Sequence, residues 1–162
     1  MLTKLFAPVL ATCLIASLML VFPHGQAAAI GDGNVVTGAG AGEFPTGATF
    51  QGIALAGGTF GIGLQTNGTG TANGDLEFQL NGSSLIGLSQ WITVTGWITS
   101  GTANPDGSVT FNGTGTLDLG DGTAPTGGLA LTGTLTATGI TVTIGGNAIP
   151  TLPKSDGWTT VE

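Results

Sequence analysis

Short runs of strand-forming residues, each ended by Gly or Asn-Gly, recur along this chain from Ala48 onward. This pattern is typical of an antiparallel all-β domain, because strand side chains alternate between two faces while Gly and Asn permit tight turns. Eight runs of this kind at regular spacing predict a two-sheet β-sandwich of jelly-roll or immunoglobulin-like type, with a small closed β-barrel as the alternative. The expected strands are residues 48–54, 59–66, 74–80, 84–88, 91–99, 108–117, 129–137 and 140–145, with 35–36 and 158–161 as outer candidates.

Strict alternation in two of these runs predicts which faces are buried. In residues 91–95 the aliphatic side chains point to one side, and Trp91 points with the threonines to the other. Residues 140–144 alternate in the same way, which predicts sheets with one buried face and one wet, threonine-rich face. Asn81-Gly82 suits a tight turn with positive φ, and Asn-Pro-Asp-Gly at 104–107 suits a type I turn.

The first 29 residues have the three parts of a secretory signal peptide. Lys4 precedes an apolar run over residues 5–22, and Ala27 and Ala29 match the small residues before a cleavage site. We therefore expect an N-terminal signal helix, cleavage after Ala29, and export to the periplasm, the cell surface or the medium. An uncleaved anchor is the alternative, since the run approaches the roughly 20 residues of a membrane helix; after cleavage we expect no stable membrane span.

Beyond the signal peptide, three segments are expected. Residues 30–47 form a Gly-rich N-terminal segment that is interpreted as a linker, because no helix follows its glycines to bind an anion. Residues 48–146 form the β-sandwich domain. Residues 147–162 are a C-terminal tail or a final strand.

Cleavage after Ala29 would remove the only Cys, the only His and one of the two cations. Lys154 and all nine carboxylates stay, so the formal charge changes from −7 to −8. A surface with a single cation has nothing to release counterions from a phosphate backbone, which excludes nucleic acid as a partner. Ser-His-Asp triads, Cys–His pairs and the common zinc sites need residues that are missing. The sequence therefore predicts a protein that is not an enzyme and that needs no cofactor.

Two pairs of carboxylates are candidate sites. Asp75 and Glu77 lie two apart on an expected strand, about 7 Å apart by strand rise. That spacing is within the range of glycosidase carboxyl pairs, but we expect both side chains to be solvated on the outer face. Asp118 and Asp121 belong to a Gly-rich turn and are the candidate ligands for calcium, which takes carboxylate and carbonyl oxygens.

Trp91 and Trp97 are the candidate ligand-binding residues. Both fall on the face opposite the aliphatic residues of their strand, and an exposed indole can stack on a sugar ring. A core position is the alternative for each, as is usual for large aromatics.

A resemblance to known proteins rests on Gly40-Ala-Gly-Glu-Phe44, Gly74-Asp-Leu-Glu-Phe78 and Gly113-Thr-Gly-Thr-Leu117 followed by Asp118. On these segments the chain resembles the small exported bacterial β-sandwich modules of secreted and surface proteins, over most of residues 34–145. The resemblance implies no catalytic motif.

The leading hypothesis is an exported non-catalytic protein with a structural, cell-surface or adhesive role, whose partner is a glycan or a surface or matrix protein. A carbohydrate-binding module that uses Trp91 and Trp97 is the main alternative. A weak carboxylate-dependent hydrolase and an ice-binding protein, the latter from the Thr-x-Thr ranks, are further alternatives.

Overall fold

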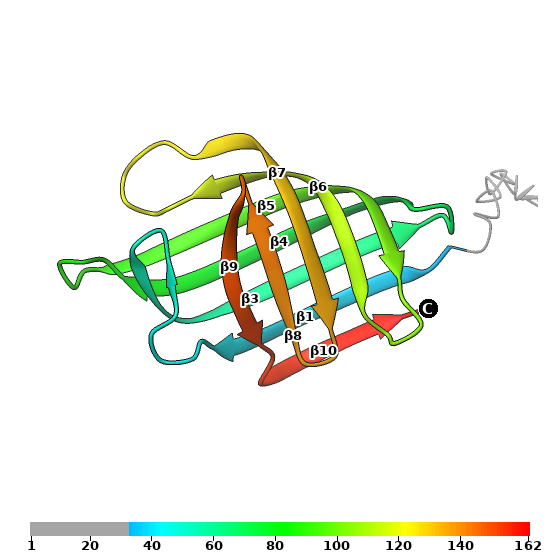
Figure 1. Cartoon of the computed structure of the whole chain (residues 1–162), viewed down its shortest axis with the longest axis horizontal. Coiled ribbons are helices and arrows are strands. Elements are labelled where there is room, and N and C mark those ends of the chain that lie inside the picture. The colour runs from blue at the N-terminus through cyan, green and yellow to red at the C-terminus, as the bar shows by residue number, and fades with distance from the viewer. Residues whose placement is uncertain (1–32) are drawn as a thin grey trace, which may run out of the picture.

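The computed structural model describes residues 33–162, and this part of the chain is built from β-strands (Figure 1). The strands are β1 (Val35–Glu43), β2 (Thr49–Phe50), β3 (Ile53–Thr66), β4 (Thr71–Ser83), β5 (Ser89–Ala103), β6 (Val109–Asp118), β7 (Thr126–Thr136), β8 (Gly139–Ile144), β9 (Asn147–Pro153) and β10 (Asp156–Val161). The expected signal helix and the cleavage after Ala29 lie outside the described residues. No helix within 33–162 has the length and apolarity needed to cross a membrane.

All ten strands belong to one antiparallel sheet in the order β10-β1-β3-β4-β5-β6-β7-β8-β9, with β2 paired to β3 beside that path. From β3 to β9 each strand pairs with the next along the chain. The strands at the two ends of this order, β9 and β10, are separated only by Lys154 and Ser155. The sheet therefore curls until its two edges meet at this link, where the Ser155 amide donates a 2.9 Å hydrogen bond to the Ala41 carbonyl.

The result is a curled half-barrel, in which β7, β8 and β9 cross in front of β1, β3, β4 and β5 (Figure 1). The expectation of an antiparallel all-β fold is confirmed. The pairing does not confirm the two separate sheets of a sandwich, because one hydrogen-bonded sheet supplies both crossing layers. The sheet continues from one layer into the other. Alternation within single strands is the same in a sandwich and in a curled sheet, so the sequence pattern does not show whether the two layers are joined.

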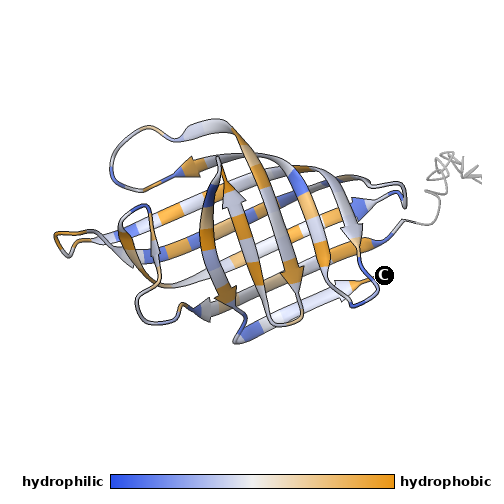
Figure 2. Cartoon of the chain, viewed as in Figure 1, coloured by the Kyte–Doolittle hydropathy of each residue, from blue (hydrophilic) through white to orange (hydrophobic). Residues whose placement is uncertain are grey.

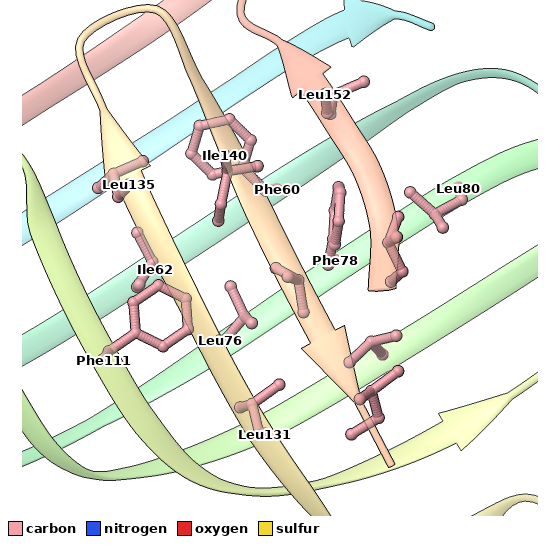
Figure 3. Packing of buried hydrophobic residues seen from close by; sticks show 14 of the residues in the cluster. Phe60, Ile62, Leu76, Phe78, Leu80, Phe111, Leu131, Leu135, Ile140 and Leu152 are labelled. Atoms are coloured by element: carbon pink, nitrogen blue, oxygen red, sulfur yellow. The ribbon is translucent and has the colours of Figure 1, made fainter. Parts of the chain in front are cut away.

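The apolar core fills the space between the two layers (Figures 2 and 3). Phe78 and Leu80 of β4 are fully buried there together with Leu131 of β7 and Ile140 of β8. The alternation predicted for β8 is confirmed, since Ile140, Val142 and Ile144 are buried and the threonines between them are not.

A close contact between β6 and β7 shows how tightly the core is packed. Phe111 of β6 stands opposite Gly133 of β7, and a Cβ added at Gly133 would collide with the Phe111 ring. The ring therefore occupies the space that a side chain on β7 would need. Phe111 is 1% exposed, so it has no room to move outward.

The Gly-rich segment expected to be a linker was wrongly assigned, because it contains β1. This strand pairs with β3 on one side and with β10 on the other. Its inward positions favour glycine because the end of β9 and the closing link pack on them: a Cβ at Gly42 would collide with the Pro153 carbonyl, and one at Gly40 would lie 2.9 Å from Lys154 Cδ. These glycines mark close backbone packing within the sheet, which is a common reason for glycine inside a strand.

Two further strand assignments were wrong. The strand expected at 48–54 is a hairpin, since the turn at Gln51-Gly52 separates β2 from β3. The strand expected at 84–88 is the connection between β4 and β5, because the pairing of Ser83 with Ser89 leaves these residues outside the ladder. Asn81-Gly82, expected in a turn, instead lies within β4. The turn at 104–107 is confirmed by a 3.0 Å hydrogen bond from the Gly107 amide to the Asn104 carbonyl.

Candidate functional site

The outer face of β10, β1, β3, β4 and β5 points away from the core and from the strands β7–β9. It carries three tryptophans: Trp91 and Trp97 on β5 are 64% and 52% exposed, and Trp158 on β10 is 52% exposed. Exposure of Trp91 and Trp97 agrees with the face that strand alternation predicted for them. Trp158 was expected only as part of a closing strand, and the register of β10 against β1 places it on the same face.

Small residues form the floor between these tryptophans. Across the strands, Trp158 pairs with Ala39, Ala39 with Gly61, and Gly61 with Glu77. A Cβ added at Gly61 or at Gly63 would meet nothing within 4 Å, so neither glycine is required by packing. With strands about 4.8 Å apart, Trp158 lies about 19 Å from β5. Ala39 and Gly61 keep the surface low on β1 and β3, whereas the exposed side chains of β4 stand next to β5.

Trp91 borders a hollow of about 550 Å³ on this face. Its floor is formed by Gly57 and Gly58 of β3, and Asn81 of β4 stands beside Trp91 in the neighbouring strand. Asn81 Oδ1 is a buried acceptor without a hydrogen-bond partner, and it is the one such side-chain atom in residues 33–162. Buried polar atoms are nearly always paired, so Asn81 Oδ1 is an exception at the edge of this hollow.

Asn81 was missed by reasoning from the sequence. The Asn81-Gly82 dipeptide is a strong turn signal, and it directed attention away from the strand that contains it. Only the register of β4 against β5 places Asn81 next to Trp91.

Trp97 borders a second, smaller hollow of about 310 Å³. The hollow is lined by threonine side chains from β5 and β6, at Thr95, Thr114 and Thr116. The two tryptophans lie on one strand six residues apart, which corresponds to about 20 Å at the rise of a strand. The outer face therefore has two hollows, each bordered by an indole ring with polar groups beside it.

Asp75 and Glu77 lie between the two hollows and are both exposed, as strand alternation predicted. Asp75 pairs with Trp97 across β4 and β5. Glu77 Oε1 accepts a 2.7 Å hydrogen bond from Gln79 Nε2. These carboxylates can accept hydrogen bonds from a ligand on the face.

Asp118 and Asp121, the candidate calcium ligands, each bind their own turn. Asp118 Oδ1 accepts a 2.8 Å bond from the Gly120 amide. Asp121 Oδ1 accepts from the Thr123 hydroxyl at 2.6 Å and from the Thr123 amide at 2.9 Å, and these bonds lower the pKa of Asp121. No group of three or more His, Cys, Asp or Glu suited to a metal occurs in residues 33–162. Calcium binding by this turn is untested, and the hydrogen bonds of both carboxylates to their own turns are the reason to expect none.

Comparison of the chain with protein-family models, with curated proteins and with solved structures finds no match. The resemblance to exported bacterial β-sandwich modules therefore stays a prediction, and the proposed function is based on the chemistry of the outer face.

Proposed function

We propose that this protein is exported and non-catalytic, and that it has a structural or adhesive role at a cell surface. The observation that carries the proposal is the outer face, which exposes three tryptophans together with small and polar side chains of β1, β3 and β4. Exposed aromatic residues gathered on one face of a folded domain mark an interaction surface. An indole contributes large contact area at a low cost in side-chain entropy.

The sequence supports a role in binding over one in catalysis. Beyond residue 29 the chain has neither His nor Cys, the usual general base and nucleophile. Asp75 beside Trp97, Glu43 at the Trp91 hollow and Glu77 are all exposed. They suit hydrogen bonding to a partner better than acid–base chemistry, which favours buried or closely paired groups.

Carbohydrate is the second candidate, as the specific ligand of the same face. The hollow beside Trp91 favours it, because an indole plane and an unpaired acceptor at Asn81 Oδ1 lie side by side there. A sugar ring presents an apolar face to stack on an aromatic ring and hydroxyl groups that donate hydrogen bonds. The threonine hydroxyls near Trp97 provide a second subsite of the same kind.

Binding to a glycan array and saccharide titrations followed by tryptophan fluorescence test this function. We expect Trp91→Ala and Trp97→Ala each to weaken binding about tenfold or more, as loss of a buried aromatic contact does. Trp158→Ala is the matched control, since Trp158 has the same exposure as Trp97 but lies four strands away.

The results separate the candidates. One result is that the protein adheres to a surface in a way that free saccharides do not inhibit. If Trp91→Ala abolishes that adhesion, the partner is a surface or matrix protein. Equal loss from all three tryptophan variants would contradict a site on β5. Turnover of any substrate that Glu77→Gln abolishes would contradict the non-catalytic proposal.

Export is part of the proposal and has its own test. The N-terminus of the protein recovered from the medium, the periplasm and the cell surface can be determined by mass spectrometry. We expect a new N-terminus at Ile30. A chain that stays in the cytoplasm with Met1 in place would contradict export.

A further inference from the structure

The connection between β4 and β5 exposes three large aliphatic side chains next to one another. Leu85, Ile86 and Leu88 are 93%, 81% and 63% exposed. The connection is the leftmost point of the molecule in Figure 1, and Figure 2 shows it as a hydrophobic tip. Single exposed aliphatics are common, but three together on a protruding turn are not explained by folding.

A second turn, at the other end of β5, shows that the apolar residues are not needed for the turn itself. In both turns the fourth residue donates to the carbonyl of the first: the Gly87 amide to Ser84 at 2.9 Å, and the Gly107 amide to Asn104 at 3.0 Å. Both glycines have nearly the same backbone angle, with φ of 78° and 79°.

At the two central positions, however, one turn has Leu-Ile and the other has Pro-Asp. Pro and Asp are residues that such turns favour, whereas Leu and Ile contribute nothing to turn geometry. The apolar pair at Leu85 and Ile86 therefore needs a different reason.

Charge restricts what can cover this tip. Residues 78–105 contain no Asp, Glu, Lys, Arg or His. Asp121 lines the groove beside Leu85 and Ile86, so the charge closest to the tip is negative. Asp121 would repel an anionic surface. A cationic surface would find this one carboxylate beside the tip and none on it, so an electrically neutral apolar phase fits the tip best.

The size and surroundings of the tip favour a lipid layer over a protein. A stable protein interface takes roughly 20–30 residues a side, which this turn alone cannot provide. A bilayer needs no complementary shape. Within the turn, the amides of Gly87 and Leu88 both donate to Ser84, so these donors would not be left unpaired in a less polar medium.

Trp91 stands at the base of the tip in a position that fits this arrangement. It lies three residues beyond Leu88, about 10 Å along β5. Apolar segments that bind membrane interfaces sink about 5–10 Å, and Trp prefers the headgroup level. The aliphatic tip thus matches the depth of the acyl region, and the exposed indole matches the depth of the headgroups in the same leaflet.

We propose that residues 84–88 form a hairpin tip that inserts reversibly into the interface of a zwitterionic phospholipid bilayer. The tip would hold the domain against a lipid surface by one corner, with Leu85 and Ile86 in the acyl region and Trp91 among the headgroups. The inference shares Trp91 with the proposed glycan site, but the aliphatic side chains of the tip lie outside both tryptophan hollows, so substitutions at the tip test it separately.

A fluorescent label at the base of the tip provides the test. The environment-sensitive dye NBD is attached to Ser89→Cys in the full chain, with Cys13→Ser to leave one thiol, and the protein is mixed with phosphatidylcholine vesicles. We expect a blue shift of the emission and quenching by brominated lipid. The matched control is a label at Thr102→Cys, which is exposed near the other end of β5 and should not respond. Because each label reports its own position, attachment of the vesicle to residues 5–22 would not imitate the result.

The turn at 104–107 supplies the loss-of-function variant. Leu85→Pro with Ile86→Asp places the residues of that turn at the tip, so the thermal midpoint should not fall while vesicle binding through the tip drops by about tenfold or more. Leu85→Ser with Ile86→Asn is the second variant, in case the first does not fold. Saccharide binding should be unchanged in both.

Four results would overturn the proposal. These are an unchanged emission at position 89 with phosphatidylcholine, an equal response at position 102, and a larger response at position 89 with phosphatidylglycerol than with phosphatidylcholine. The fourth is a dimer, seen by light scattering without lipid, that the Leu85→Pro and Ile86→Asp variant abolishes, since the tip would then be covered by a second copy of the chain.

Discussion

Gly133→Ala should destabilise the fold through its contact with Phe111. The new Cβ would collide with Phe111 Cζ and lie 2.7 Å from Cε2 and 2.8 Å from the Thr141 carbonyl oxygen, whereas carbon atoms in contact prefer about 3.5–4.0 Å. Overpacking of this kind costs about 1–3 kcal/mol, and replacing a strand glycine by alanine returns about 0.5–1 kcal/mol. We expect a net loss of about 1–2 kcal/mol in the free energy of unfolding.

Urea unfolding followed by tryptophan fluorescence measures this loss. With a slope of about 1–3 kcal/mol per molar urea, the midpoint should fall by about 0.3–2 M. Gly63→Ala is the matched control, because its Cβ would meet nothing within 4 Å, and its midpoint should stay or rise.

A double-mutant cycle tests the cause. Phe111→Leu alone should cost about 1–2 kcal/mol by leaving a cavity. In the double variant the shorter side chain at position 111 makes room for the methyl group that Gly133→Ala adds, so the two losses should overlap by about 1 kcal/mol. Losses that simply add would refute the reasoning, because the clash with the ring would then not be the source of the effect.

Three further outcomes are expected. Gln51 has a φ of +49° in the hairpin turn between β2 and β3, so Gln51→Asn should raise stability by about 0.5–1 kcal/mol in the same urea assay, and a lower midpoint would contradict strain at this residue. Hydrogen bonds from Ser108 and Thr123 lower the pKa of Asp106 and of Asp121 below the ordinary value. Each carboxylate therefore supports its turn above that ordinary value and loses this support as the pH falls through the lowered pKa, which an NMR titration of the turn amides measures; loosening at a higher pH would contradict the assignment. Because Asp118 and Asp121 bind their own turns, calcium or a chelator should leave the thermal midpoint unchanged, and a rise with calcium would restore the metal site.

Much of the local structure could be predicted from the sequence, because it depends on neighbouring residues alone. The alternation around Ile92 and Ile140 determines which side of each strand is apolar, and burial agrees with it at both places. The turn at 104–107 is specified by its own Pro, Asp and Gly. The exposure of Trp91 and Trp97 follows from the same alternation, so the tryptophans of the candidate site on β5 could be predicted without a structure.

Pairing partners could not be predicted in this way. Asn81 reads as a turn residue until β4 is aligned with β5, and only that register places its unpaired oxygen next to Trp91. Gly40 and Gly42 read as linker until the closing link is seen to pass over β1. Each of these features depends on how strands are aligned and packed, which adjacent residues do not specify.

The sequence alone determined the composition of the chain, the strand-forming runs and the side of each strand that is apolar, since these follow from the chemistry and periodicity of adjacent residues. The tertiary structure decided that one sheet curls on itself, that three tryptophans share one outer face, and that residues 84–88 form an exposed tip and not a strand. The physical reason is that hydrogen-bond register and close packing are set between strands, and the short link between β9 and β10 fixes how those strands can be brought together.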